Sequence, residues 1–359
     1  QRLLKLKPYK KKRKTLTRNL NSLLKFSFYF FNLIKRYRFS RFNFYKNFFV
    51  KNFKEGRPVG IHKDFYPREE KEEENRVARI SSFNEKGELD GETISFYPSG
   101  KKQQKACFKE GKLEGNKSVW DEEGNLVLEI EYKQNLLNGK FFQRTTEGKE
   151  IIFHYENDKK QGPHIIYYPH DIQWGRQKAL EVYFVDDEME GIGTEYNEKG
   201  EKVVSVNYVK GKKQGLMEVF DAKGKVILRA SFKNDLKEGP LQEFYSDGSL
   251  RKESFYVADI QEGEEKSYFK NGKIERYSFY KNGKLEGLSY IKNKEGITIF
   301  EAEYKQGLRE GKFNKYYEDG KPQLLQTFHQ DALQGIKKSY TAEGVCVESR
   351  WENGKKISG

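Results

Sequence analysis

The sequence is poor in the residues that build a deep globular core or a cross-linked framework. Only 35% of its 359 residues are hydrophobic, and only two are cysteines. Cys107 and Cys346 lie far apart, which argues against a disulfide framework or a cysteine metal cluster and favours a reducing intracellular compartment. The longest apolar run, at 23–34, contains Lys25 and falls short of the roughly 18 residues of a membrane-spanning helix.

Acidic residues are missing from one end of the chain. Residues 1–54 contain 17 lysines and arginines and no aspartate or glutamate. Subtracting these from the 68 basic residues of the chain leaves 51 basic against 54 acidic residues, a balance of −3. We therefore expect a basic N-terminal extension, 1–52, joined to a nearly neutral body, 53–359.

Motifs with known chemistry are also missing. The five histidines are His62, His154, His164, His170 and His329. His164 and His170 are the closest pair, and their spacing matches no common metal site. Neither G-x-S-x-G nor the phosphate-binding G-x-x-x-x-G-K-[ST] occurs. The sequence therefore predicts no enzyme, no cofactor, no metal and no small-molecule substrate.

What the body has in abundance is glycine at a fixed period. The octapeptide YKNGKLEG at 280–287 recurs as FKEGKLEG at 108–115 and YKQGLREG at 304–311. Its second glycine stands at positions 60, 91, 115, 139, 162, 191, 215, 239, 263, 287, 311, 335 and 359. The last seven intervals are all 24 residues, which predicts about twelve repeats of 24 residues.

Other positions keep the phase of this marker glycine. Seven residues before it stands Phe or Tyr in most repeats, and five residues after it another aromatic residue, except at Arg144 and Lys292. Four residues before it stands Gly, Asn or Asp, the residues that tolerate a positive φ. Two turns per repeat leave two strands rich in Tyr, Phe, Val and Ile.

The predicted fold is therefore all-β, an elongated single-layer antiparallel β-meander. About 24 strands at a spacing of ~4.8 Å would stack over roughly 115 Å. Small residues lie two positions before the aromatic of the second strand, on the same face, where they would make room for rings from neighbouring strands. They are Ala106, Ala230, Ser254, Ser278 and Ala302.

The segments YKNGKLEGLSYI and YKQGLREGKFNKYYEDGK resemble MORN repeats. They are similar to the variant found in bacterial antitoxin-like MORN proteins, with an N-G-K-x-x-G turn, a Y-Y pair and a D-G-K turn. The resemblance covers about 53–359. It implies a scaffold, a tether or a membrane-apposition module, and the array is predicted to contact neighbouring proteins.

Two insertions disturb the period. The first, within 68–80, is acidic, and we interpret it either as a solvated loop or as a contact with a partner. The second, within 169–180, carries Trp174 and Arg176, which are candidate protein-interface residues. The alternative for Trp174 is that its ring folds back over the sheet.

The basic extension carries the strongest functional signal. Apolar residues recur at three or four residues and predict a helix over about 17–38. Its cations are interleaved with Phe and Tyr, a pattern that suits phosphates and unpaired bases. The candidate RNA-binding residues are Lys10, Lys11, Lys12, Arg13, Lys14, Arg18, Lys35, Arg36, Arg38, Phe39, Arg41, Phe42, Tyr45 and Lys46.

Three interpretations of this extension compete. It could bind rRNA or another structured RNA, bind an anionic membrane surface, or be residual targeting sequence. We predict a non-enzymatic structural subunit of a large assembly, a peripheral mitochondrial ribosomal protein of the matrix. The alternative is a MORN scaffold of a membrane-associated or respiratory-chain complex, with the extension on anionic lipid. An enzyme or antitoxin-type regulator is a third hypothesis, which leaves the extension without a role.

Overall fold

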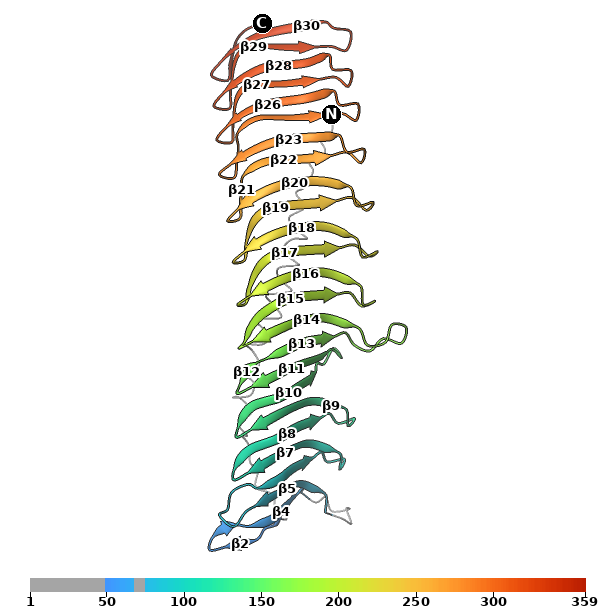
Figure 1. Ribbon diagram of the computed structural model, residues 1–359, viewed down its shortest axis with the longest axis vertical. Coiled ribbons are helices and arrows are strands. Elements are labelled where there is room, and N and C mark those ends of the chain that lie inside the picture. Colours follow the sequence, from blue (N-terminus) through green and yellow to red (C-terminus); the bar gives the residue numbers. More distant parts are fainter. Residues whose placement is uncertain (1–48, 68–74) are drawn as a thin grey trace. The chain divides into compact units, whose positions relative to one another are not determined.

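The computed structural model describes residues 49–67 and 75–359, and in this part of the chain strands and turns are the regular elements (Figure 1). Contacts divide the chain into Gln1–Phe48 and Phe49–Gly359. The helix expected over 17–38, the RNA-binding residues and part of the acidic insertion lie outside the described residues. Within the described residues there is no helix, as the density of turn glycines predicts.

The strands follow one another along the chain. They are β1 (Phe49–Val50), β2 (Phe53–Lys54), β3 (Arg57–Pro58), β4 (Gly60–Phe65), β5 (Val77–Phe83), β6 (Gly91–Phe96), β7 (Lys102–Lys109), β8 (Lys112–Trp120), β9 (Leu126–Lys133), β10 (Leu136–Arg144), β11 (Glu150–Glu156), β12 (Lys159–Lys160), β13 (Gly162–Tyr167), β14 (Lys178–Val185), β15 (Glu188–Tyr196) and β16 (Lys202–Val209). They continue with β17 (Lys212–Phe220), β18 (Val226–Lys233), β19 (Leu236–Phe244), β20 (Leu250–Val257), β21 (Ile260–Gln261), β22 (Gly263–Tyr268), β23 (Ile274–Lys281), β24 (Lys284–Leu285), β25 (Gly287–Lys292), β26 (Thr298–Lys305), β27 (Leu308–Tyr316), β28 (Pro322–His329), β29 (Ala332–Tyr340), β30 (Cys346–Glu352) and β31 (Lys355–Ser358).

These strands form one antiparallel sheet of 29 strands, and the β2–β3 hairpin forms a second small sheet. The predicted antiparallel meander is confirmed, because from β4 to β31 each strand path pairs with the one that follows it along the chain. The count exceeds the expected 24 partly because β12, β21 and β24 are short pieces that precede β13, β22 and β25 in the same strand path.

The core lies on one face of this sheet. Val206, Met217, Ala230 and Leu241 are cross-strand partners on four successive strands, so their side chains form a continuous row. We call the face that carries this row the apolar face. The small side chains predicted to make room for rings are buried there, from 0% exposure at Ala302 to 8% at Ser278. The densest cluster comprises Val182, Phe184, Val204, Val206 and Tyr208.

The opposite face is mixed and more polar. Its central row runs through Glu218, Arg229, Gln242 and Glu253, which are partners on β17 to β20. We call this the polar face. The alternation of the two faces is the period-two pattern expected of strands.

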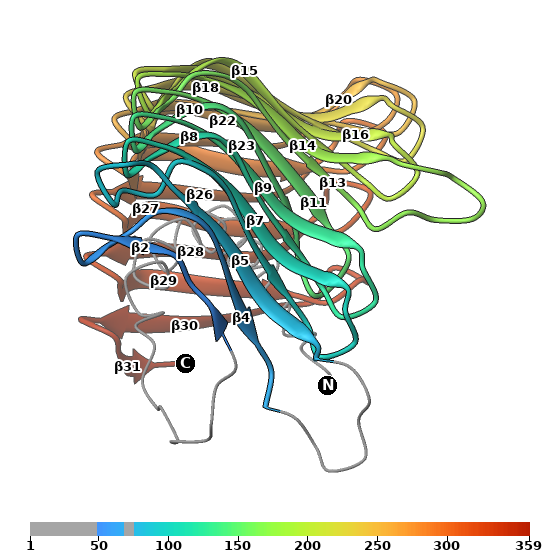
Figure 2. The same ribbon diagram turned by 90° about the horizontal axis from the view of Figure 1, so that it is seen from below.

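The marker glycines are β-bulge positions. Val206 pairs with Met217, whereas Tyr208 pairs with Lys213. An advance of two residues on β16 is therefore matched by four residues on β17, which is a bulge in β17. Gly215 lies inside this irregularity at a φ of +80°, which only glycine adopts without cost. A bulge bends its strand, and Figure 2 shows the bent strands in a view along the sheet.

The predicted left-handed turn column is confirmed. Asp235 has a φ of +71°, and Gly283 has a φ of +75°. Where the column holds Asp or Asn, the side chain also links two repeats, since Asp235 Oδ1 accepts the Lys213 N–H at 2.8 Å. The same contact recurs at Asn135, Asp158, Asp187, Asp259 and Asp331.

A second inter-repeat contact comes from the residue before the marker glycine. Glu238 accepts the backbone N–H of Ala258, in the next repeat, at 2.9 Å. The same acceptor role falls to Asp90, Glu114, Glu190, Gln214, Glu262, Glu286, Glu310 and Gln334. The sequence reading did not identify this column, although it holds Asp, Glu, Asn or Gln before every marker glycine from Gly91 to Gly335.

Candidate docking site at the inserted hairpin

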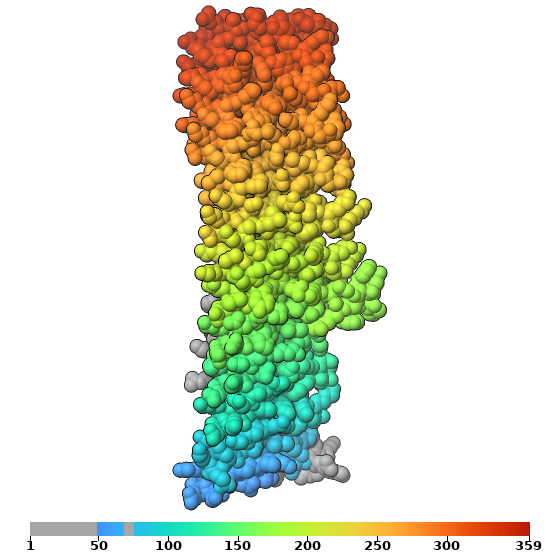
Figure 3. Space-filling model, in the orientation of Figure 1, coloured from blue at the N-terminus to red at the C-terminus, as the bar shows by residue number. Residues whose placement is uncertain are grey.

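Three irregularities of the repeat coincide in the segment 139–191. The interval from Gly139 to Gly162 is 23 residues, and the next is 29. Arg144 replaces the aromatic residue expected five positions after the marker. The longer interval is an inserted hairpin between β13 and β14, which projects from the sheet in Figures 1 and 3. Because every interval from Gly191 onward is 24 residues, the segment 139–191 is the main irregularity of the array after Gly91.

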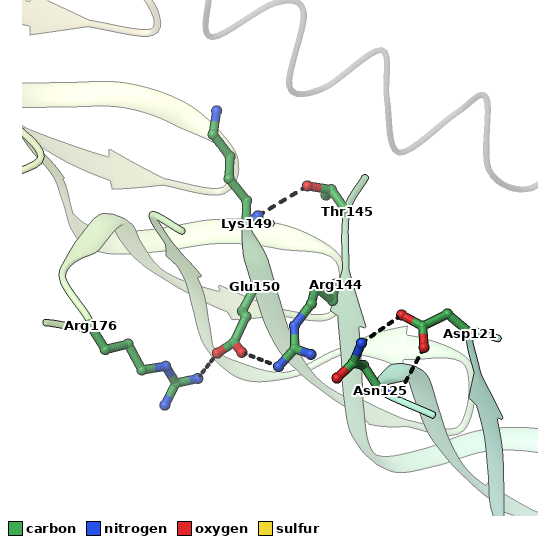
Figure 4. A network of polar contacts seen from close by, with 7 residues as sticks. All are labelled: Asp121, Asn125, Arg144, Thr145, Lys149, Glu150 and Arg176. Atoms are coloured by element: carbon green, nitrogen blue, oxygen red, sulfur yellow. Dashed lines mark hydrogen bonds and ion pairs between the residues drawn. The ribbon is translucent and has the colours of Figure 1, made fainter. Parts of the chain in front are cut away.

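The base of the hairpin is held by a charged network. Glu150 opens β11 and accepts hydrogen bonds from Arg144 Nη2 at 2.8 Å and from Arg176 Nη2 at 2.6 Å. Figure 4 shows the Glu150 carboxylate between the two guanidinium groups. Arg176 also lies over the Tyr167 ring, 3.8 Å from its centroid. The hairpin is thus fixed to the sheet at its end rather than attached by a flexible link.

The electrostatics of Glu150 follow from this position. Burial raises its pKa, but the hydrogen bonds and charges of Arg144 and Arg176 outweigh burial and hold the pKa below its ordinary value. The carboxylate therefore remains ionised at neutral pH. It neutralises part of the positive charge of two arginines at the edge of the polar face.

A shallow hollow of about 460 Å³ lies beside this network on the polar face. Its apolar lining comes from Leu126, Phe142, Ile152 and the Tyr168 ring. Its charged and polar lining comes from Glu129, Lys140, Glu150, His170 and Arg176. Phe142 is 8% exposed, so the hollow has a fixed aromatic floor. The arrangement can hold an apolar group next to a charged one.

The two candidate interface residues divide between the sides of the hairpin. Arg176 lines the hollow, whereas Trp174 is outside the set of lining residues. Trp174 is 41% exposed, and Lys199 Nζ lies 5.7 Å from the centroid of its ring. At the tip, Ile172 is fully exposed. Strand β14 begins at Lys178 and strand β5 at Val77, so the inserted residues lie before these positions within 169–180 and 68–80.

Sequence reasoning missed most of the hollow. Lys140, Phe142 and Ile152 occupy ordinary strand positions, and nothing in their own residue type marks them. The one-residue shortening between Gly139 and Gly162, together with the exception at Arg144, was the signal that could have located the site.

The histidines gather at no metal site in the described part of the chain. His164 lies on the apolar face between the rings of Phe153 and Phe184, at 3.9 and 5.6 Å between centroids. Burial and the nearby Lys160 charge lower the pKa of His164 to about 3. Its ring nitrogens have no hydrogen-bond partner among the described residues. Across 49–67 and 75–359, no helix is long and apolar enough to cross a membrane.

Together these features define a class: a repeat protein whose single antiparallel sheet is built by near-identical hairpin units that contact only their neighbours. Comparison of the sequence with known families identifies the repeat. The family described as MORN repeat variant matches residues 89–110, 113–134, 237–258, 261–282 and 309–330. The chain is a MORN-repeat protein.

Comparison with curated proteins gave no match. Among solved structures, the chain is similar to a mutant form of the Tc holotoxin pore of Photorhabdus luminescens. The identity is 12% and the TM-score 0.18, over 86% of this chain and 22% of that one. A likeness at this level carries no functional argument.

Proposed function

We propose that the chain is a non-enzymatic structural subunit of a large ribonucleoprotein, in which the basic extension binds RNA and the repeat array contacts neighbouring proteins. The observation that carries this proposal is the separation of charge, with 17 cations and no anion in residues 1–54. The finer proposal is a peripheral subunit of a mitochondrial ribosome in the matrix.

The array supports a scaffold role. Its recurrent polar residues have structural partners, as the contacts of Asp235 and Glu238 illustrate. Its recurrent glycines lie at turns and bulges with positive φ. These residues are thereby occupied in joining one repeat to the next, which suits a rigid platform for other proteins.

Salt titration tests the RNA-binding half. The full chain should bind a structured RNA with an affinity that falls about a thousandfold or more between about 50 and 200 mM salt, because several phosphates are neutralised at once. Deletion of 1–52 should abolish this binding. An RNA affinity that does not depend on salt concentration, or that persists after deletion of 1–52, would refute the proposal.

The second candidate is a scaffold at a membrane surface, which the same cations and aromatic residues favour. Flotation of the full chain with anionic vesicles, compared with the chain lacking 1–52, separates it from the first. Tight RNA binding without flotation supports the ribonucleoprotein, and flotation without RNA binding supports the membrane scaffold.

A further inference from the structure

We infer that the hollow beside the inserted hairpin, together with the face of that hairpin, docks a linear segment of another protein that carries an acidic side chain next to a large apolar one. The inference deepens the proposed scaffold function and rests on it, because it names the chemistry of one partner of the array.

The cationic donors that remain available in the site select an acidic partner. Lys140 and Arg176 line the hollow together with two carboxylates, Glu129 and Glu150, so the charges of the lining balance, but the two cations are incompletely paired. The link from Lys140 Nζ to Glu129 is long, 3.9 Å, and its side chain is more than half exposed. Arg176 uses one nitrogen on Glu150, while a guanidinium carries five N–H donors. A carboxylate of the partner can therefore bind Lys140 and the remaining N–H donors of Arg176 without displacing Glu150.

The floor of the site selects a large apolar side chain beside that carboxylate. Phe142, Ile152 and Leu126 contribute apolar lining to the same hollow as the charged side chains. The volume of about 460 Å³ lies within the roughly 300–1,000 Å³ of typical binding sites. An aromatic or a leucine side chain would cover this floor and exclude water from the ion pairs, which strengthens them.

Exposed apolar side chains also lie outside the hollow, which favours a peptide chain over a small molecule. Ile172 at the tip of the hairpin is fully exposed. On the polar face, Tyr183 pairs with Pro163 and is 50% exposed, and Ile192 on the next strand is 65% exposed. A ligand confined to the hollow would leave these side chains in water, whereas an extended segment that crosses β13 to β15 would cover them.

The regular repeats provide matched controls. Lys312 stands at the position of Lys140, one residue after the marker glycine, and is likewise exposed. Arg229 pairs with Glu218 at 2.8 Å and lies 5.7 Å from the Phe244 ring centroid, as Arg176 pairs with Glu150 and covers Tyr167. The double variant K140Q/R176Q removes a lysine and a ring-covering arginine from the specialised segment, and its control K312Q/R229Q removes the corresponding groups from two ordinary repeats.

The test is selection of a displayed library of random linear peptides on the full-length chain, followed by titration of the consensus peptide. We expect a consensus with Asp or Glu within two residues of Phe, Tyr, Trp or Leu. We expect its affinity to fall roughly tenfold or more in K140Q/R176Q and to stay within about twofold in K312Q/R229Q.

No consensus, a consensus without an acidic residue, or equal losses in the two variants would overturn the inference. The result is separable from the RNA test, which depends on 1–52 and not on the hollow. Peptide recognition that persists without RNA binding refutes the ribonucleoprotein role alone. The reverse outcome refutes the docking site alone.

Discussion

At the scale of single residues, the regular contacts between repeats matter more than any isolated side chain. In nine repeats the residue before the marker glycine accepts a backbone N–H of the next repeat through a carboxylate or an amide oxygen. Glu238 and Gln214, for example, accept the N–H groups of Ala258 and Asn234 at 2.9 and 3.1 Å. Charge at this position is therefore secondary to the hydrogen bond itself.

This equivalence gives the first prediction. E238A should leave the Ala258 N–H without its acceptor and cost about 1 kcal/mol locally, since a lost hydrogen bond of this kind costs about that amount. Hydrogen exchange at Ala258 should accelerate correspondingly. E238Q is the control and should keep wild-type protection, and slow exchange in E238A would contradict the assigned role.

The second prediction concerns acid and His164. The pKa of this buried side chain is lowered to about 3 in the folded chain, against an ordinary value of 6.5. Between these pH values the unfolded chain binds a proton at this histidine and the folded chain does not. The contribution of neutral His164 to the free energy of unfolding is therefore complete above about pH 6.5, and roughly 4 kcal/mol of it is lost at pH 3. Urea midpoints at several pH values, compared between wild type and H164F, measure this loss.

H164F should remove this part of the acid sensitivity, because other repeats place Phe141 or Phe313 at the same position. The control H154Q alters an exposed histidine on the adjacent strand and should leave the acid sensitivity unchanged. An identical pH dependence in wild type and H164F would show that protonation of His164 does not limit stability.

At the scale of the element, the hairpin turn of YKNGKLEG is defined by backbone conformation. Asn282 and Gly283 both have a positive φ, as do Asn234 and Asp235 in an earlier repeat. The Asp side chain adds a hydrogen bond to Lys213 N–H that glycine does not supply. The turn with Asp235 therefore has one more inter-repeat hydrogen bond than the turn with Gly283, but aspartate adopts a positive φ less readily than glycine does.

The third prediction follows from that comparison. G283D should accept the Gln261 N–H, as Asp235 accepts that of Lys213, and should be more stable than G283A by about 1 kcal/mol. G283A has the same positive φ and no acceptor, so it is the matched control. Urea midpoints and hydrogen exchange at Gln261 measure the difference. Equal stability of the two variants would show that the side-chain bond contributes nothing.

The sequence predicted these elements well because turns constrain residue type at every repeat. A position that requires positive φ selects Gly, Asn or Asp, and the selection is visible without a structure. The bend of the strands was not predictable, because it depends on how Val206 and Tyr208 pair across β17. The hollow was not predictable from any one repeat, because its lining comes from positions as distant as Leu126 and Arg176.

At the scale of the repeat array, stability should be the sum of similar units and of the contacts between neighbours. Each repeat places its two strands between those of adjacent repeats, and both recurrent side-chain contacts, at Asp235 and Glu238, reach only to a neighbouring repeat. No described strand pairing skips a whole repeat in the part of the sheet from β14 to β31. Removal of one complete unit should therefore preserve every class of contact.

The fourth prediction is that deletion of residues 216–239 leaves a folded array. This deletion removes one 24-residue period and joins Gly215 to Pro240. Pro240 follows a marker glycine, Gly239, in the natural chain, so the phase of the repeat is kept at the junction. The far-UV circular dichroism should remain that of a β protein. Hydrogen-exchange protection in the flanking repeats should match wild type, since each interface they form is recreated at the junction.

Deletion of residues 228–239 is the contrasting variant, because it removes half a period. It leaves the first strand of one repeat followed directly by the first strand of the next. Every strand after the junction then runs in the opposite direction relative to the repeats before it, so its turns lie at the other edge of the sheet. The acceptors at Glu262 and Glu286 would then lie opposite the wrong turn, and protection should be lost from the junction onward. If the half-period deletion were as well protected as the full-period one, the 24-residue unit would not be the physical unit of stability, and the array would be held by its backbone pairing alone.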